Sequence, residues 1–159
     1  MKLCDGIIVL KKILLFILVL LPVSLSANAY WPLSWCYTSS NEVHIVECDS
    51  DYTGVVTIPA EINGRPVTKI YEDAFNYSSH VTHVEVPASV STLTEYHFKV
   101  MWGLESITVA EEHESYQTVD GVLFSREMDQ LISYPRAKPD ESYVMPETCL
   151  LYTSDAADE

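Results

Sequence analysis

The chain has 159 residues, the length of one domain, with 48% apolar residues and a formal net charge of −14. Of its 9 basic and 23 acidic side chains, residues 30–148 hold 6 and 19, which gives that stretch a net charge of −13. A surface this acidic repels phosphate backbones and anionic lipid headgroups, which argues against nucleic-acid binding and against adsorption to a membrane surface. With 20% charged and 11% aromatic residues, the chain is composed as a folded domain.

Residues 1–29 have the pattern of a secretory signal peptide. Lys11 and Lys12 end a positively charged segment, residues 13–21 are uninterruptedly apolar, and a small-x-small motif ends at Ala29. Nine apolar residues are too few to span a bilayer, which needs about 20, so cleavage after Ala29 is favoured over an uncleaved anchor. The pattern predicts a secreted or surface-displayed chain without a membrane span after cleavage.

Residues 149–159 read CLLYTSDAADE, and their composition departs abruptly from the sequence before them. One permitted reverse translation of all eleven residues resembles the end of a transposon-type sequencing adaptor. We interpret the segment as a translated adaptor that is not native, and we expect the natural protein to be cut short there. The alternative is an ordinary acidic tail.

Two cysteines lie between these terminal segments, Cys36 and Cys48. In an oxidising compartment two thiols twelve positions apart could form a disulfide, so this pair is a candidate bridge. The alternative is two separate cysteines, one of them buried. Metal binding is disfavoured, because no CxxC motif or nearby histidine pair completes a set of four ligands.

A period of 23 residues organises the middle of the chain. The pattern Ile-x3-Ala-Phe-x5-Val-x2-Val-x-Val that begins at Ile70 returns 23 positions later, beginning at Leu93. Every aliphatic residue meets an aliphatic residue and Phe75 meets Phe98, whereas Ala74 meets His97. The period predicts a repeated core made of Ile58, Ile70, Ala74, Phe75, Val81, Val84, Val86, Leu93, Phe98, Leu104, Ile107 and Val109.

Alternation with a period of two predicts short strands over residues 55–58, 81–86 and 104–109. The Ile58-Pro59 and Val86-Pro87 dipeptides are 28 positions apart, because residues 63–66 form an additional turn. Each unit is too small to bury its own apolar side chains, so units must stack against one another. The predicted fold is therefore a β-rich solenoid of the α/β class with parallel short strands.

The repeat resembles that of the BspA-like leucine-rich repeat surface proteins of bacteria. The resemblance is carried by VTIPAEINGRPVTKIYEDAF, by VTHVEVPASVSTL and by LESITV. It implies a leucine-rich-repeat solenoid, a hairpin inserted at about residues 115–135, and a role in surface adhesion. The sequence departs from the family pattern at Tyr71 and Thr94, where glycine is usual, and at His97, where a small residue is usual.

The resulting layout has an N-terminal hairpin over residues 30–52, which shields the first repeat, and a repeat region over residues 53–148. Short helical turns are expected near residues 72–76 and 95–99. The inserted hairpin is expected to pair residues 119–125 with 130–135. Residues 142–147 are expected to begin another repeat strand beside residues 107–109.

The sequence offers no sign of catalysis, a cofactor or a metal site. His80 and His83 are three positions apart, but on a strand that spacing points their side chains to opposite faces. The acidic run at residues 111–114 fits a solvated surface better than an acid–base pair. We therefore expect that the chain is not an enzyme.

Four aromatic residues lie at variable positions of the repeat and form the candidate binding surface: Tyr71, Tyr77, Tyr96 and Trp102. Exposed aromatic side chains on a rigid frame are typical of binding hot spots. The alternative is that they fill gaps between repeats, which is favoured for Trp102. The function expected is non-catalytic binding to host or bacterial surface proteins. A repeat module of a longer extracellular enzyme and a structural envelope protein are the alternatives.

Overall fold

The computed structural model describes residues 32–140 and 142–149. The predicted signal peptide and its cleavage site lie outside the described residues, as does the adaptor-like segment apart from Cys149. The described part is rich in strands, and its one helical element is a single 3-10 turn, η1 (Glu95–His97). None of the helices in this part is long and apolar enough to cross a membrane.

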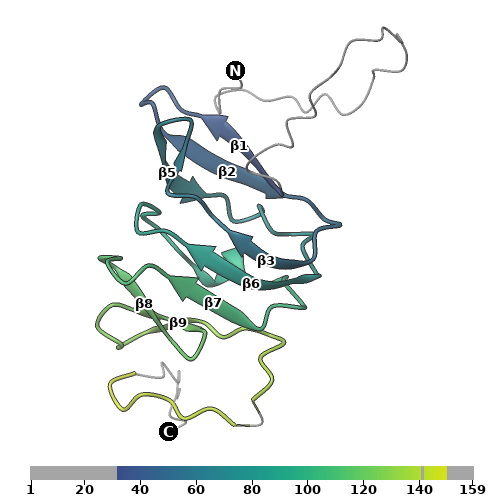
Figure 1. The fold of residues 1–159 in the computed structure, drawn as a ribbon. Coiled ribbons are helices and arrows are strands. Elements are labelled where there is room, and N and C mark those ends of the chain that lie inside the picture. Colours follow the sequence, from purple (N-terminus) through teal and green to yellow (C-terminus); the bar gives the residue numbers. More distant parts are fainter. Residues whose placement is uncertain (1–31, 141, 150–159) are drawn as a thin grey trace, which may run out of the picture.

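The strands are short and fall into three sheets (Figure 1). The sheets have the orders β1-β2-β5-β4, β3-β6-β7 and β10-β9-β8. In chain order, the strands are β1 (Leu33–Tyr37), β2 (Val43–Cys48), β3 (Gly54–Thr57), β4 (Glu61–Ile62), β5 (Arg65–Ile70), β6 (Val81–Val86), β7 (Ser106–Val109), β8 (Tyr116–Val119), β9 (Val122–Ser125) and β10 (Leu131–Ser133).

Strands β3, β6 and β7 run parallel and lie one after another in a stack (Figure 1). Val56 pairs with Val84, 28 positions away, and Val84 pairs with Ile107, 23 positions away. These steps equal those read from the sequence. The five extra residues of the first step are accommodated by the β4–β5 hairpin, whose turn at Asn63 and Gly64 has φ values of 53° and 72°.

The same step of 23 residues recurs outside the strands. The Ser91 N–H donates to the Thr68 carbonyl at 3.1 Å. Strand β2 in turn pairs parallel with β5. Successive turns of the chain therefore contact each other on more than one side, which joins neighbouring layers through backbone hydrogen bonds.

The core lies between these layers. All twelve core positions expected from the repeat are buried, together with residues that the repeat did not single out, such as Val90 and Met101. Phe75 and Phe98 are both enclosed in it. Because each side chain contacts the layers above and below, burial of apolar surface stabilises the stack as a whole.

Strands β1 and β2 form an antiparallel hairpin, but the disulfide expected within it is wrong. Cys48 is a free, buried thiol, and Cys36 is disulfide-bonded to a residue other than Cys48. In the hairpin register, Cys36 lies opposite His44, whereas Cys48 lies opposite Leu33, so the two sulfurs do not face each other. Burial raises the pKa of the Cys48 thiol, which keeps it in the protonated form.

The inserted segment is a three-stranded antiparallel sheet in place of the expected two-stranded hairpin. The Asp120-Gly121 turn, with φ values of 50° and 78°, separates β8 from β9 inside the segment expected as one strand. The Ile107 N–H donates to the Gly121 carbonyl at 2.9 Å, so this turn lies against the free edge of β7. The insertion therefore occupies the place where the next repeat strand was expected.

Residues 142–149, as far as the structure describes them, contain no strand, so the expected repeat strand at residues 142–147 is wrong. Tyr143 instead packs on the insertion, with its ring centroid 6.5 Å from that of Phe124 and 5.5 Å from that of Tyr134. The Thr148 hydroxyl donates to the Met128 carbonyl at 3.0 Å. Because the β8–β9 turn covers the edge of β7, this segment follows the insertion.

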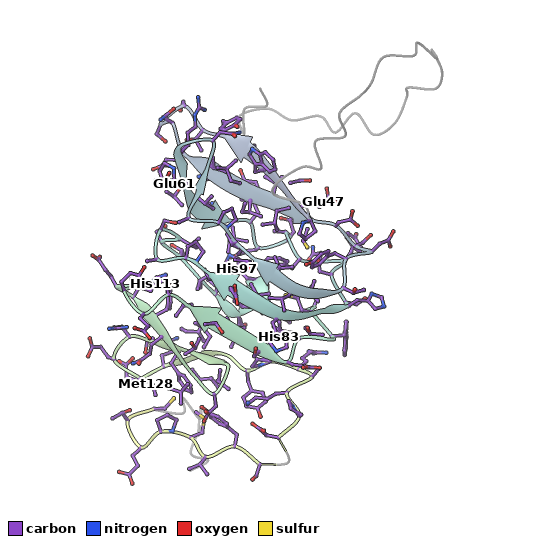
Figure 2. The ribbon with its side chains drawn as sticks, in the orientation of Figure 1. Glu47, Glu61, His83, His97, His113 and Met128 are labelled. Carbon is purple, nitrogen blue, oxygen red and sulfur yellow. The ribbon has the colours of Figure 1, made fainter. Side chains whose placement is uncertain are left out.

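His97 occupies the position where the repeat pattern has a small residue, and it is buried there (Figure 2). Its Nε2 lies 3.1 Å from the Ile70 carbonyl of the preceding layer, and its Nδ1 accepts the Thr94 N–H at 3.0 Å. A carbonyl can only accept and an N–H can only donate, so these partners fix the neutral tautomer with the proton on Nε2. The histidine thus joins two layers that the usual alanine would leave unbonded at this point.

Candidate binding surface

The structure separates the four candidate aromatic residues into two groups. Tyr77, Tyr96 and Trp102 are 77%, 52% and 66% exposed. Tyr71 packs against the core, and its ring centroid lies 5.8 Å from that of His44. The alternative in which the ring fills a gap is therefore wrong for Trp102, where it was favoured, and holds for Tyr71. We refer to Tyr77, Tyr96 and Trp102 as the aromatic ridge.

Two members of the aromatic ridge stand on turns that pack directly on each other. Tyr77 lies in the turn before β6 and Trp102 in the turn before β7. A side chain at Gly103 would place its Cβ only 2.5 Å from the Ser79 carbonyl oxygen, so the two backbones are in close contact. This contact requires glycine and holds the neighbouring aromatic residues on a rigid base.

Cations lie over aromatic rings in this protein. The Lys99 Nζ lies 5.5 Å from the ring centroid of Tyr96, and the Arg136 guanidinium lies 3.9 Å from that of Trp102. Arg65 over Tyr37 and Lys69 over Tyr71 repeat the arrangement at 4.4 and 5.2 Å. Such contacts restrict an exposed ring without covering it, which lowers the entropy lost when a partner binds.

The carboxylates, in contrast, are mostly left without a cation. In the part of the chain that the structure describes, the one ion pair is that of Lys138 with Asp140, at 2.7 Å. Residues 30–148 hold 19 acidic side chains, so most of their charge is exposed to solvent. The surface around the aromatic ridge is thus strongly negative.

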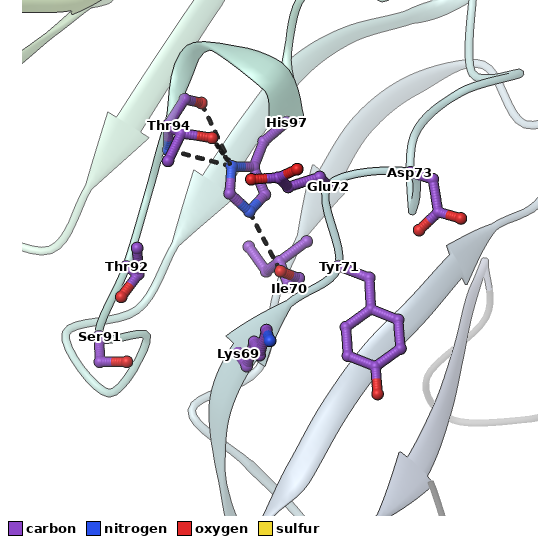
Figure 3. Close-up of a pocket in the computed structure, with 9 residues that line it drawn as sticks. All are labelled: Lys69, Ile70, Tyr71, Glu72, Asp73, Ser91, Thr92, Thr94 and His97. Carbon is purple, nitrogen blue, oxygen red and sulfur yellow. Dashed lines mark hydrogen bonds between the residues drawn. The ribbon is translucent and has the colours of Figure 1, made fainter. Parts of the chain in front are cut away.

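A pocket of about 660 Å³ opens between two neighbouring layers (Figure 3). It lies where Tyr71 and Thr94, which are 23 positions apart, depart from the glycine of the repeat pattern. Sequence reasoning recorded both departures without recognising that they meet. The pocket is lined by Lys69, Ile70, Tyr71, Glu72, Asp73, Ser91, Thr92, Thr94 and His97.

The paired histidines expected to be solvated do not converge. His80 Nδ1 lies 3.2 Å from the Ser79 hydroxyl and His83 Nδ1 lies 2.8 Å from the Thr82 hydroxyl. Among the described residues, no group of three or more histidine, cysteine, aspartate and glutamate side chains could hold a metal ion.

His113 repeats the arrangement of His97 one layer further along. Its Nε2 lies 2.9 Å from the Val90 carbonyl and its Nδ1 accepts the Ser115 N–H at 3.2 Å, which defines the neutral tautomer. Burial lowers the pKa of His113 below its ordinary value of 6.5, and Arg126 acts in the same direction. The hydrogen bond to Val90 and the charge of Glu114 oppose the shift without cancelling it.

This shift predicts a loss of stability in mild acid. Because the pKa of His113 is lower in the folded state, the unfolded chain takes up the proton first as the pH falls through 6.5. The unfolding free energy of the wild type relative to His113→Gln should be largest above pH 7 and decrease as the pH falls toward 5. Urea unfolding of both proteins at several pH values measures this difference, and glutamine serves as a non-titrating donor. A difference that stays constant between pH 7.5 and 5 would contradict the assignment.

The fold is similar to that of solved leucine-rich repeat structures. A leucine-rich repeat protein from Eubacterium ventriosum matches at 25% identity over 60% of this chain and 24% of its own, with a TM-score of 0.50. The pneumococcal vaccine antigen PcpA matches at 29% identity over 60% of this chain and 29% of its own, with a TM-score of 0.41. No protein-family model and no curated protein matches the sequence.

These comparisons support a leucine-rich repeat protein of the bacterial type. They do not distinguish the BspA-like family from other leucine-rich repeat proteins. The chain spans only about a quarter of the length of the two structures it matches.

Proposed function

We propose that this chain is a leucine-rich repeat solenoid module that binds other proteins outside the cytoplasm and has no catalytic activity. The repeat spacing and the similarity to a bacterial leucine-rich repeat protein support the module. The signal-like pattern of residues 1–29 supports export. A role in adhesion at a cell surface follows from the family resemblance and belongs to the proposal.

The observation that carries the binding function is the aromatic ridge. Large apolar side chains are normally withdrawn from water, yet three aromatic rings stand mostly exposed here. Two of them lie beside ordered cations, and two stand on turns in direct backbone contact. Restrained, exposed aromatic side chains on a rigid frame give a partner large contact area at low entropic cost.

The test is an array of purified secreted proteins and receptor ectodomains, probed with the labelled full chain. We expect at least one partner whose affinity falls tenfold or more for the triple variant Tyr77→Ala, Tyr96→Ala and Trp102→Ala. The matched control is Val55→Ala with Val144→Ala, which removes two other exposed apolar side chains. An array without any binder, or binders that lose equal affinity in both variants, would overturn the proposal.

A further inference from the structure

The pocket between the layers is chemically distinct from the aromatic ridge. Its inner wall contains Ile70 and His97, which are buried, and its rim contains Glu72 and Asp73, whose carboxylates are exposed. The His97 ring is already bonded at both nitrogens, so it shapes the wall and has no further hydrogen bond to offer (Figure 3). The free polar groups at the rim are therefore acceptors with negative charge.

The cation of the pocket does not neutralise this rim. The Lys69 Nζ lies 5.2 Å from the Tyr71 ring centroid, and neither Glu72 nor Asp73 forms an ion pair with a described residue. Forming a new ion pair with these carboxylates would therefore not require breaking an old one. The surrounding surface is also negative, which attracts a cation over a longer range and repels an anion.

The shape of the pocket selects among cationic ligands. A volume of about 660 Å³ exceeds what a metal ion occupies, and the lining has no group of metal ligands among the described residues. An arginine or lysine side chain has an aliphatic stem that can lie along an apolar wall and a charged head that can reach the rim. The planar guanidinium of arginine can in addition pair with a carboxylate through two parallel hydrogen bonds.

From this arrangement we infer that the pocket receives an arginine or lysine side chain from a basic segment of a partner protein. This inference rests on the proposed binding function and specifies the partner: a protein with an exposed basic segment. The carboxylates of Glu72 and Asp73 bind the charged head, and the wall at Ile70 contacts the stem. The aromatic ridge and the pocket then act as separate contact points.

The experiment measures binding of a fluorescent hexa-arginine peptide to the full chain at physiological salt by fluorescence polarisation. Hexa-citrulline, which has nearly the same shape without the charge, is the control peptide. We expect Glu72→Gln with Asp73→Asn to weaken hexa-arginine binding at least tenfold. The matched variant Asp51→Asn with Glu111→Gln removes the same two charges from exposed positions outside the pocket lining, and it should change binding less than threefold.

A second variant separates the cavity from its charge. Thr92 is exposed and lines the pocket, so Thr92→Leu narrows the pocket without changing any charge, and we expect binding to weaken several-fold. Equal losses in the two carboxylate variants, no effect of Thr92→Leu, equally tight binding of hexa-citrulline, or no binding of hexa-arginine would overturn the inference. None of these outcomes depends on the aromatic ridge, so failure here is distinguishable from failure of the binding function.

Discussion

Replacing Phe75 or Phe98 with alanine is expected to lower the free energy of unfolding by about 3–5 kcal/mol in either variant. Both rings are buried, and they occupy equivalent positions 23 residues apart in neighbouring layers. Truncation removes the apolar surface of a whole ring and leaves a cavity that the stacked backbone cannot close, since hydrogen bonds between layers hold it in place.

Urea unfolding followed by circular dichroism measures this loss. Tyr77→Ala is the matched control, because it also removes an aromatic ring two residues from Phe75 but from an exposed position. The control should stay within about 0.5 kcal/mol of the wild type. If both phenylalanine variants were as stable as the control, the two rings would not be equivalent core elements and the repeat would be misaligned.

Replacing Gly103 with alanine is expected to cost about 2–3 kcal/mol, in the range of overpacked sites. The new Cβ would lie 2.5 Å from the Ser79 carbonyl oxygen, and a backbone atom in a stacked turn cannot move aside as a flexible side chain can. The two turns must separate, which disturbs the base of the aromatic ridge.

Gly64→Ala provides the comparison for this variant. A Cβ at Gly64 would have no atom within 4 Å, so its cost is limited to the unfavourable φ of +72°, about 1–2 kcal/mol. Thermal and urea unfolding of both variants give the two values. A Gly103→Ala variant no less stable than Gly64→Ala would show that the contact between the turns is loose.

The repeat spacing could be predicted because it is a property of the sequence alone. Every aliphatic position 23 residues apart pairs a buried side chain with a buried side chain, so the pattern determines the register of β6 and β7. The 28-residue step was also readable, because asparagine followed by glycine at residues 63–64 is a strong signal for a tight hairpin turn.

The cysteine pair could not be predicted from its spacing. The register of β1 against β2 depends on the irregularity between Ser34 and Trp35, and it leaves Cys36 and Cys48 facing other residues. The strand expected after the insertion failed for a similar reason. The Asp120-Gly121 turn contacts β7, and a contact between segments so far apart in the fold has no signature in either segment.

The binding surface was predictable only in part. Tyr71, Tyr77, Tyr96 and Trp102 look alike in the sequence, but whether a ring is exposed depends on what stands beside it. Tyr71 has His44 and Lys69 as neighbours, whereas Tyr77 has none that cover it. The pocket depends on the space between two backbone layers, which no single repeat contains.

The unequal steps of the stack separate two properties that a simple repeat would link. The β4–β5 hairpin adds five residues to one layer, yet β3 and β6 pair as β6 and β7 do. Loop length at the Asn63-Gly64 turn and strand alignment are thus under independent control. Related chains can diverge in the length and chemistry of such loops while the scaffold stays constant, and a peptide grafted at this turn would be displayed without displacing a strand.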